Sequence, residues 1–441
     1  MLASQLAYLL SVARIESKSL ITIQSHIMKF LWRGRPPKVA KSTITLGIEK
    51  GGLKAPDLLI MNKASRIAWI GRLFRLKDLT FVQVLESKIH SSLEASVRSD
   101  FDKKWISSRQ IPAFYKEMFI WFNEIHQFRE PKSGKAIRMQ SIWHNMAVKV
   151  QGRALVSKSL IETGAPLIDD FVGNDGSILT HLVFCERHPG LSVNPLTYLG
   201  WCRAIPPRWR RTLIGSVPLT ADERSAEPVL VIKEKEVPIT CIRSCYFYAT
   251  LLPENIPTAQ RRWEAEGVNF DWGQIYALPF KTSQSTKLQS LQYRITHRYF
   301  PTRKYLCIRQ ITDDPFCDNC GEVETIEHYF FLCSEITSFW RDIICRIRQF
   351  ITDIGHISFP CYNIIFGSPL YPRPVNLILF LAKQYIAMQK YDDGPLCIQG
   401  FRTVLLKMFI MEKTIAIKND KMEKFREQWK PFVNENNVFV F

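Results

Sequence analysis

The sequence predicts a mainly α-helical protein with more than one domain, and three observations support that fold class. The chain has 441 residues, enough for two or three domains of about 150 residues each. Apolar residues recur at helical spacing along most of it, and 46% of all residues are hydrophobic, so packed cores are expected. Residues 315–340 hold a close group of cysteines and a histidine, which is typical of a small metal module.

The N-terminal segment, residues 1–80, is predicted to be helical. Apolar residues recur at helical spacing through residues 1–31 and 62–74. Arg35-Pro36-Pro37 ends the first helical pattern because proline lacks a backbone N–H group, and Gly51-Gly52 marks a turn. The chain begins inside a helical pattern with no capping residue. We interpret this as a sign of a fragment of something longer.

The same segment is strongly basic. It carries fourteen Lys or Arg against four Asp or Glu, and many of the cations cluster between Lys29 and Lys54. Such a surface is either a solvated basic face or a contact for nucleic acid. The predicted nucleic-acid contacts in this segment are Lys29, Arg33, Arg35, Lys38 and Lys41.

The middle of the chain, residues 81–237, reads as a connector. Its first part is helical and rich in aromatic residues, whereas residues 143–180 contain short β-branched runs broken by glycine turns. A small mixed subdomain is therefore expected there. Prolines in this region predict a domain boundary in a linker near residues 216–238. The linker separates the connector from a C-terminal domain over residues 238–441.

The C-terminal domain is predicted to be helical around its metal motif. Residues 284–299 give the clearest amphipathic pattern, with Leu288, Leu291 and Ile295 on one face. Lys287, Arg294 and Arg298 fall on an adjoining stripe, at offsets of seven and eleven residues. The other helices are expected over residues 243–252, 258–266, 338–350, 375–391, 398–418 and 419–429.

The metal motif consists of Cys317, Cys320, His328 and Cys333 in the pattern C-x2-C-x7-H-x4-C. A close Cys pair on a tight turn, followed by a His and a Cys, can bring four donors around one tetrahedral ion, and Zn²⁺ prefers that ligand set. Four protein ligands leave no open position for water, so the predicted zinc is structural. The alternatives are ordinary buried thiols with a surface histidine, or substitution of a ligand by the flanking Cys307 or Cys345.

Charge is divided sharply around this motif. Residues 281–312 contain seven Lys or Arg and no acid, whereas residues 313–340 contain seven Asp or Glu and no Lys or Arg. A module that itself grips phosphate should be basic, so the zinc turn is interpreted as a clamp behind a basic binding face. A solvated helix flank is the alternative. The residues predicted to form that face are Lys287, Arg294, His297, Arg298, Arg303 and Lys304.

The overall charge points to a polyanionic partner. The 59 Lys and Arg outnumber the 41 Asp and Glu, which gives a net charge of +18, and RNA or DNA is the leading candidate. The N-terminus lacks a secretory leader, and no apolar run reaches about 18 residues free of charge. We therefore expect an intracellular protein, cytoplasmic or nuclear, that does not enter membranes.

Catalytic signatures are mostly missing. There is no phosphate-binding loop, and Tyr391-Asp392-Asp393 lacks the spacing of a polymerase aromatic-x-Asp-Asp hairpin. A rival interpretation is a Mg²⁺-dependent nuclease, which would need distant carboxylates to fold together, such as Asp169, Asp170, Asp392 and Asp393.

Three stretches resemble the region after the polymerase core in the replication protein of LINE-type non-LTR retrotransposons. FLWRGRPPKVAKSTITLGIEKGGLKAPDL looks like that family's thumb segment, and WHNMAVKVQGRALVSKSLIETGAPLIDDFVGNDG is similar to its central connector. Residues from TKLQSLQYRITHRYF to LCSEITSFW look like its C-terminal zinc-binding module, here about residues 281–345. Cys317, Cys320, His328 and Cys333 match the family's metal ligands one by one.

The resemblance implies that the thumb-like and zinc-module regions help to grip template RNA and target DNA. The chain departs from the full family pattern because polymerase fingers and palm, an upstream endonuclease and a Pro-Asp after Cys333 are all missing. We therefore expect it neither to polymerise nor to cut. The prediction is a non-catalytic, nucleic-acid-binding part of a reverse transcriptase. A domesticated zinc-dependent interaction protein without nucleic-acid binding is a further alternative.

Overall fold

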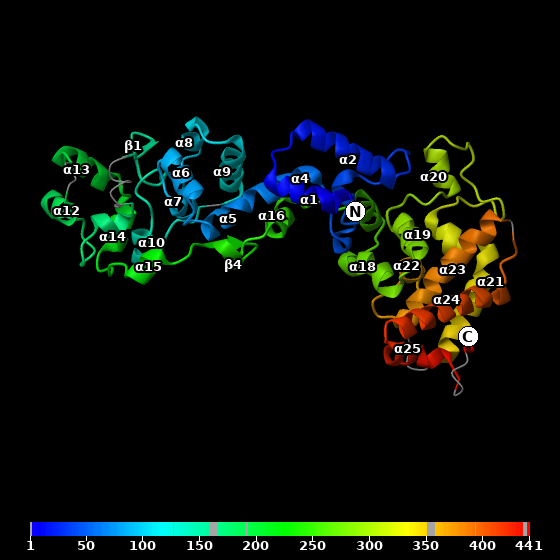
Figure 1. The fold of residues 1–441 in the computed structure, drawn as a ribbon. Helices are drawn as coiled ribbons and strands as arrows, with labels where there is room; N and C mark the ends of the chain where they lie inside the picture. The colour runs from blue at the N-terminus through cyan, green and yellow to red at the C-terminus, as the bar shows by residue number, and fades with distance from the viewer. Residues whose placement is uncertain are drawn as a thin grey trace. The chain divides into compact units, whose positions relative to one another are not determined.

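The computed structural model describes residues 2–126, 128–157, 166–189, 193–350, 358–392, 394–434 and 439–441. These residues are mainly helical, as predicted, and their paired strands form two short antiparallel hairpins (Figure 1). The chain divides into two compact units. The first contains Met1–Leu31 and Pro56–Pro253, and the second contains Trp32–Ala55 and Glu254–Phe441.

The compact units group residues by contact, so they differ from the three segments that composition predicts. Trp32–Ala55 is expected with the N-terminal segment, but it packs within the second unit. The predicted linker near residues 216–238 lies inside the first unit. It holds helix α15 (Ala221–Ser225) and the hairpin of β3 (Val229–Ile232) and β4 (Lys235–Pro238). The three-segment division remains a prediction.

The first unit is a series of short helices. The pattern over residues 1–31 forms two helices, α1 (Leu2–Val12) and α2 (Ser17–Leu31). Asp57 caps the next helix, because its carboxylate accepts the backbone N–H groups of Leu59 and Ile60. The remaining elements are α4 (Leu58–Ile67), α5 (Trp69–Arg75), α6 (Thr80–Ile89), α7 (Leu93–Arg98), α8 (Lys103–Ser108), α9 (Ala113–Ile125), α10 (Gly134–Arg138), β1 (Lys149–Val150), β2 (Arg153–Ala154), η2 (Ile168–Phe171), α12 (His181–Arg187), α13 (Pro195–Ala204), α14 (Pro207–Leu213), α15 (Ala221–Ser225), β3 (Val229–Ile232), β4 (Lys235–Pro238), η3 (Ile239–Cys241) and α16 (Ser244–Leu251).

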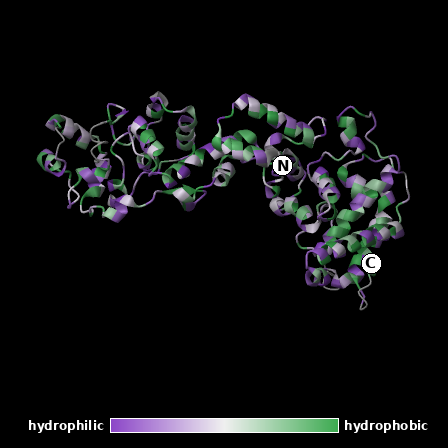
Figure 2. Ribbon diagram, in the orientation of Figure 1, coloured by the Kyte–Doolittle hydropathy of each residue, from purple (hydrophilic) through white to green (hydrophobic). Residues whose placement is uncertain are grey.

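The second unit surrounds one large hydrophobic core. Helices α19, α22 and α23 lie side by side in it (Figure 1), and hydrophobic residues gather on α23 (Figure 2). The elements of this unit are α3 (Lys41–Ile44), η1 (Ile48–Lys50), α17 (Thr258–Ala265), α18 (Trp272–Thr282), α19 (Thr286–Thr296), α20 (Arg303–Ile308), the π-helical turn η4 (His328–Leu332), α21 (Ser334–Phe350), α22 (Cys361–Phe366), α23 (Arg373–Tyr391), α24 (Ile398–Lys418), α25 (Met422–Trp429) and η6 (Lys430–Phe432).

Helix α19 is shorter than the pattern over residues 284–299 predicts. Its apolar face is buried as expected, with Leu288, Leu291 and Ile295 in the core. The helix ends at Thr296, and Arg298 then adopts φ +56°, a left-handed backbone conformation that turns the chain away. Arg298 therefore does not continue the helical stripe of Lys287 and Arg294.

Two glycines allow close packing at the end of the segment formed by residues 32–55. Gly51 has φ +80°, and a Cβ atom placed there would lie 2.9 Å from the Cγ atom of Pro257 and 2.9 Å from the Tyr276 ring. At Gly52 a Cβ atom would lie 2.1 Å from the carbonyl oxygen of Leu46. Gly51 thus packs closely against Pro257 and α18, whereas Gly52 closes the chain back onto Leu46, and glycine fits both positions because it has no side chain.

Among the described residues, no helix combines the length and the apolar character that a membrane span requires.

Candidate metal centre and basic groove

The four predicted metal ligands come together in the second unit. The Nε2 atom of His328 lies 3.2 Å from the Sγ atom of Cys320, and the Cys333 sulfur lies 3.9 Å from that of Cys320 and 4.0 Å from that of Cys317. All four donor atoms lie within 4.8 Å of one another. A tetrahedron of thiolates around Zn²⁺, with Zn–S bonds of about 2.3 Å, has edges of about 3.8 Å. The donor spacing therefore fits a zinc ion held by all four residues.

The first two ligands sit on a tight hairpin. Phe316 and Val323 form an antiparallel bridge, and the Cys317 N–H group donates to the Glu322 carbonyl at 2.8 Å. Gly321, directly after Cys320, has φ +74° and closes the turn, while its N–H group donates to the Cys317 carbonyl at 2.9 Å. The predicted turn around the metal is thus fixed by the backbone itself.

The other two ligands flank the π-helical turn η4. The hydroxyl of Thr325 accepts the His328 N–H group at 3.1 Å, and the Cys333 N–H group donates to the His328 carbonyl at 3.1 Å. Cys333 directly precedes the 17-residue helix α21, and the backbone N–H group of Glu335 bonds its sulfur. A helix N-terminus favours negative charge, so it suits a thiolate ligand.

Burial favours the neutral forms of these side chains when no ion is bound. It raises the pKa of the Cys333 thiol to about 11 and lowers the pKa of His328, in each case because the charged form loses contact with water. Three thiols and one imidazole at this spacing form the closed ligand set of structural zinc sites. Cys307 and Cys345 lie outside the group.

Acidic residues of the zinc turn bind helix α20, which lies within the basic stretch 281–312. The buried carboxylate of Glu324 accepts the Arg303 N–H group at 2.8 Å and lies 3.8 Å from the Lys390 Nζ atom. Its backbone carbonyl accepts the Lys304 N–H group at 3.3 Å. The Arg303 side chain is in turn paired with Asp318, and it lies 3.7 Å from Asp314. The N-terminus of α20 is therefore tied to the metal turn.

Four of the predicted nucleic-acid contacts line one groove of about 640 Å³ in the second unit, which we call the basic groove. Its walls are the loop before α3, helix α17, the turn after α19 and helix α20. Among the described residues that line it, five carry a positive charge and only Glu266 carries a negative one. The cations are Lys38, Arg262, Arg298, Lys304 and Arg309, and the fourth predicted contact is His297.

Two of these predicted contacts are not free side chains. Arg298 donates to Glu266 at 2.7 Å and lies over the Trp263 ring, 4.1 Å from its centroid. His297 is only 7% exposed, and its ring packs against Tyr293 at 4.1 Å between centroids. Burial lowers the pKa of His297 to about 4, so the ring is neutral at physiological pH and offers no charge to a phosphate.

Four other predicted contacts line a second groove of about 1350 Å³ beside the zinc turn, which we call the mixed groove. Five cations line it, but four carboxylates among the described residues nearly cancel their charge. Arg294 is half-buried over the Phe300 ring, and its Nε atom has no partner among the described residues. The cations are Arg33, Lys287, Arg294, Arg303 and Lys390, and the carboxylates are Asp318, Glu324, Glu335 and Asp392.

The remaining three predicted contacts line neither groove. Lys29 is exposed in the last turn of α2 in the first unit. Arg35 is exposed in the loop before α3, and Lys41 is half-buried at the start of that helix. Arg262, Arg309 and Lys390 are groove cations that the sequence did not single out. Arg309 does fall in the acid-free stretch 281–312, which is the signal that could have identified it.

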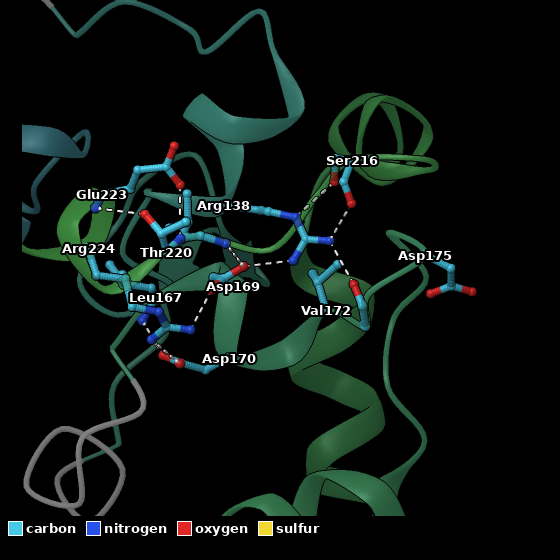
Figure 3. A network of polar contacts seen from close by, with 12 residues as sticks. Arg138, Leu167, Asp169, Asp170, Val172, Asp175, Ser216, Thr220, Glu223 and Arg224 are labelled. Atoms are coloured by element: carbon cyan, nitrogen blue, oxygen red, sulfur yellow. Dashed lines mark hydrogen bonds and ion pairs between the residues drawn. The ribbon is translucent and has the colours of Figure 1, made fainter.

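Two of the four carboxylates in the rival nuclease interpretation, Asp169 and Asp170, are paired with arginines (Figure 3). Arg138 donates to Asp169 at 2.6 Å, and Arg224 pairs with both Asp169 and Asp170, the latter at 2.8 Å. The N–H group of Leu167 donates to the second oxygen of Asp170 at 2.9 Å. Asp392 is exposed after α23 in the second unit, and Asp393 lies outside the described residues. A metal ion at Asp169 and Asp170 would have to displace two arginines.

Comparison with known proteins places this geometry in a family context. Residues 246–340 match a family described as zinc-binding in reverse transcriptase. This span contains all four residues of the metal cluster and four of the five basic-groove cations. The chain is also 25% identical over 190 residues to the transposon TX1 uncharacterized 149 kDa protein of Xenopus laevis. That alignment covers 39% of this chain and 13% of the Xenopus protein. The Cys3His cluster therefore lies in a zinc-binding module of the reverse-transcriptase type, in a chain distantly homologous to a transposon protein.

Proposed function

We propose that this chain is a non-catalytic, nucleic-acid-binding part of a retrotransposon reverse transcriptase, which grips RNA or DNA with its second unit. The observation that carries the proposal is the basic groove, where five cations face one carboxylate within and beside a reverse-transcriptase zinc-binding module. Neutralising phosphates releases condensed counterions, which drives binding to a polyanion. The mixed groove is a weaker candidate for binding phosphates, because its positive and negative charges nearly balance.

Zinc has a supporting role in this proposal. The ion would hold the hairpin of Cys317 and Cys320 against the turn of His328 and Cys333. That hairpin fixes α20 through Glu324, and α20 and the residue directly after it supply Lys304 and Arg309 to the basic groove. The ion would therefore order the binding surface without contacting the nucleic acid.

Other parts of the chain complete the proposal. We infer a thumb-like segment over residues 1–80, a connector over residues 81–237 and the zinc-bearing domain over residues 238–441. The occupied carboxylates of Asp169 and Asp170 support a binding role rather than a nuclease. If the chain binds the RNA or DNA of a retrotransposon, it works where these nucleic acids are found, so we infer an intracellular location in the cytoplasm or the nucleus.

The test compares two double variants that remove equal charge from the second unit. Lys304→Ala with Arg309→Ala empties part of the basic groove, whereas Arg402→Ala with Lys407→Ala removes two exposed cations of α24 that line neither groove. Binding of labelled RNA and DNA is measured by fluorescence anisotropy across a salt series. The groove variant should bind more weakly, with a slope of log affinity against log salt that is shallower by about 1 to 2, since each phosphate contact contributes about 0.7 to 0.9.

Three outcomes would contradict the proposal. Equal losses in both double variants would mean that overall charge, and not the groove, drives binding. No binding of RNA or DNA at low salt would favour the interaction protein without nucleic-acid binding. Mg²⁺-dependent cleavage of a plasmid, abolished by Asp169→Asn or Asp392→Asn, would favour the nuclease.

A further inference from the structure

Two polar atoms of residues that line the basic groove have no hydrogen-bond partner among the described residues. They are the Nε2 atom of His297 and the hydroxyl of Tyr305, and both atoms are buried. A buried polar atom without a partner costs free energy, so an unpaired donor or acceptor in a groove wall points to a ligand that pairs with it.

The two atoms offer complementary chemistry. The Gly51 carbonyl accepts a hydrogen bond from the His297 ring, so the other nitrogen of the neutral ring, Nε2, is an acceptor. The hydroxyl of Tyr305 can donate. One acceptor and one donor in the same groove match the edge of a nucleobase, which carries both kinds of group.

The rest of the groove suits the other parts of a nucleotide. Lys38, Arg262 and Lys304 provide cations for a phosphate. The guanidinium of Arg309 lies over the Tyr305 ring, 5.5 Å from its centroid, and unstacked bases pack on such aromatic and guanidinium planes. The volume of about 640 Å³ is in the range of sites that hold one small ligand.

We propose that the basic groove takes a single unpaired nucleotide, with its phosphate among the cations and its base edge at His297 and Tyr305. This rests on the proposed function in so far as a nucleic-acid strand is the source of the nucleotide. A free nucleoside monophosphate has the same chemistry and is the other source. A base paired within a duplex has its edge occupied, so the groove selects single strands over duplexes.

The experiment removes only the unpaired hydroxyl. Tyr305→Phe keeps the ring beneath Arg309, and because that hydroxyl has no partner in the protein, the melting temperature should not fall. The matched control is Tyr391→Phe, at an exposed tyrosine of the mixed groove. The full zinc-loaded chain is titrated with a labelled single strand of about eight nucleotides, within the usual site size, and with the blunt duplex of the same sequence. Nucleoside monophosphate and ribose 5-phosphate serve as competitors.

The wild-type chain should bind the strand more tightly than the duplex, and Tyr305→Phe should weaken strand binding about fivefold, the loss expected for one hydrogen bond. Duplex binding and the Tyr391→Phe control should be unchanged, and the nucleoside monophosphate should compete better than ribose 5-phosphate. Equal binding of strand and duplex with no effect of Tyr305→Phe overturns the nucleotide site, but it leaves the proposed function standing if Lys304→Ala with Arg309→Ala weakens both.

Two further outcomes separate the sources. Direct binding of the nucleoside monophosphate, measured by calorimetry, with no binding of strand or duplex, keeps the site for a free nucleotide and overturns the proposed function. No binding of any of these probes overturns both.

Discussion

Replacing one metal ligand tests the zinc centre and the clamp role together. Cys320→Ser removes a half-buried thiol whose sulfur lies 3.2 Å from the Nε2 atom of His328. Structural zinc sites bind their ion with an apparent free energy of about 10–16 kcal/mol near neutral pH, which is comparable to the stability of a whole domain. Loss of a ligand should therefore release the ion from the purified protein.

The structure indicates which residues should lose stability when zinc is released. Between residues 313 and 327 most side chains are exposed or half-buried, and Ile326 is the one large aliphatic side chain of the described core there. Burial of one such side chain contributes about 1.5–3 kcal/mol, which cannot hold a fifteen-residue hairpin and turn closed against its conformational entropy. Helix α23 has its own buried face in the same core and should stay folded.

Hydrogen exchange and metal content measure the result. Amide exchange over residues 313–327 should accelerate by about a hundredfold or more, because each 1.4 kcal/mol of lost local stability is a factor of ten, while exchange in α23 changes little. Cys345→Ser, which alters an exposed thiol outside the cluster, is the control and should keep both zinc and protection. Retention of one zinc ion per chain by the Cys320→Ser variant, measured by mass spectrometry, would refute the assignment of the ligands.

Three further substitutions test the packing of buried residues in the two units. Gly51→Ala places a Cβ atom 2.9 Å from Pro257 at φ +80°, and should lower stability by about 2 kcal/mol in thermal unfolding; an unchanged melting temperature would contradict this packing. Asp169→Asn leaves the buried Arg138 charge without its carboxylate, so denaturant unfolding should show a loss of about 3 kcal/mol with zinc content unchanged. Lys383 is fully buried, and burial lowers its pKa well below the ordinary value, so the unfolded chain binds the extra proton and stability should rise with pH toward 10. Lys383→Met should flatten that rise, and an identical pH profile would show that Lys383 does not cause it.

Local spacing explains why the metal centre could be predicted from the sequence. Cys317 and Cys320 are three residues apart on a glycine-closed turn, and His328 and Cys333 bracket one π-helical turn, so most of the ligand geometry is set within seventeen residues. Helix α23 was predicted for a similar reason. Its apolar residues form a continuous run, and Arg373–Tyr391 agrees with the expected 375–391 to within two residues.

Long-range packing explains what could not be predicted. Lys38 shares a groove with Lys304 because Gly51 seats residues 32–55 against α18, and no local pattern encodes that contact. His297 follows a basic helix in the sequence and could be read as a surface contact. Its burial beside Tyr293 depends on where α19 ends, which is set by the left-handed conformation of Arg298.

Glu324 explains how an acidic zinc turn can serve a basic surface. Acidic residues near a phosphate site would weaken it if they faced the ligand. The Glu324 carboxylate is instead buried, where it accepts the Arg303 N–H group at the N-terminus of α20 and faces Lys390. Its negative charge is thereby used within the protein to hold α20, while the Lys304 and Arg309 side chains of that region line the basic groove. The opposite charges of residues 281–312 and 313–340 are thus two sides of one contact: the acidic turn positions the basic helix, and the basic helix supplies the charge that a polyanion would meet.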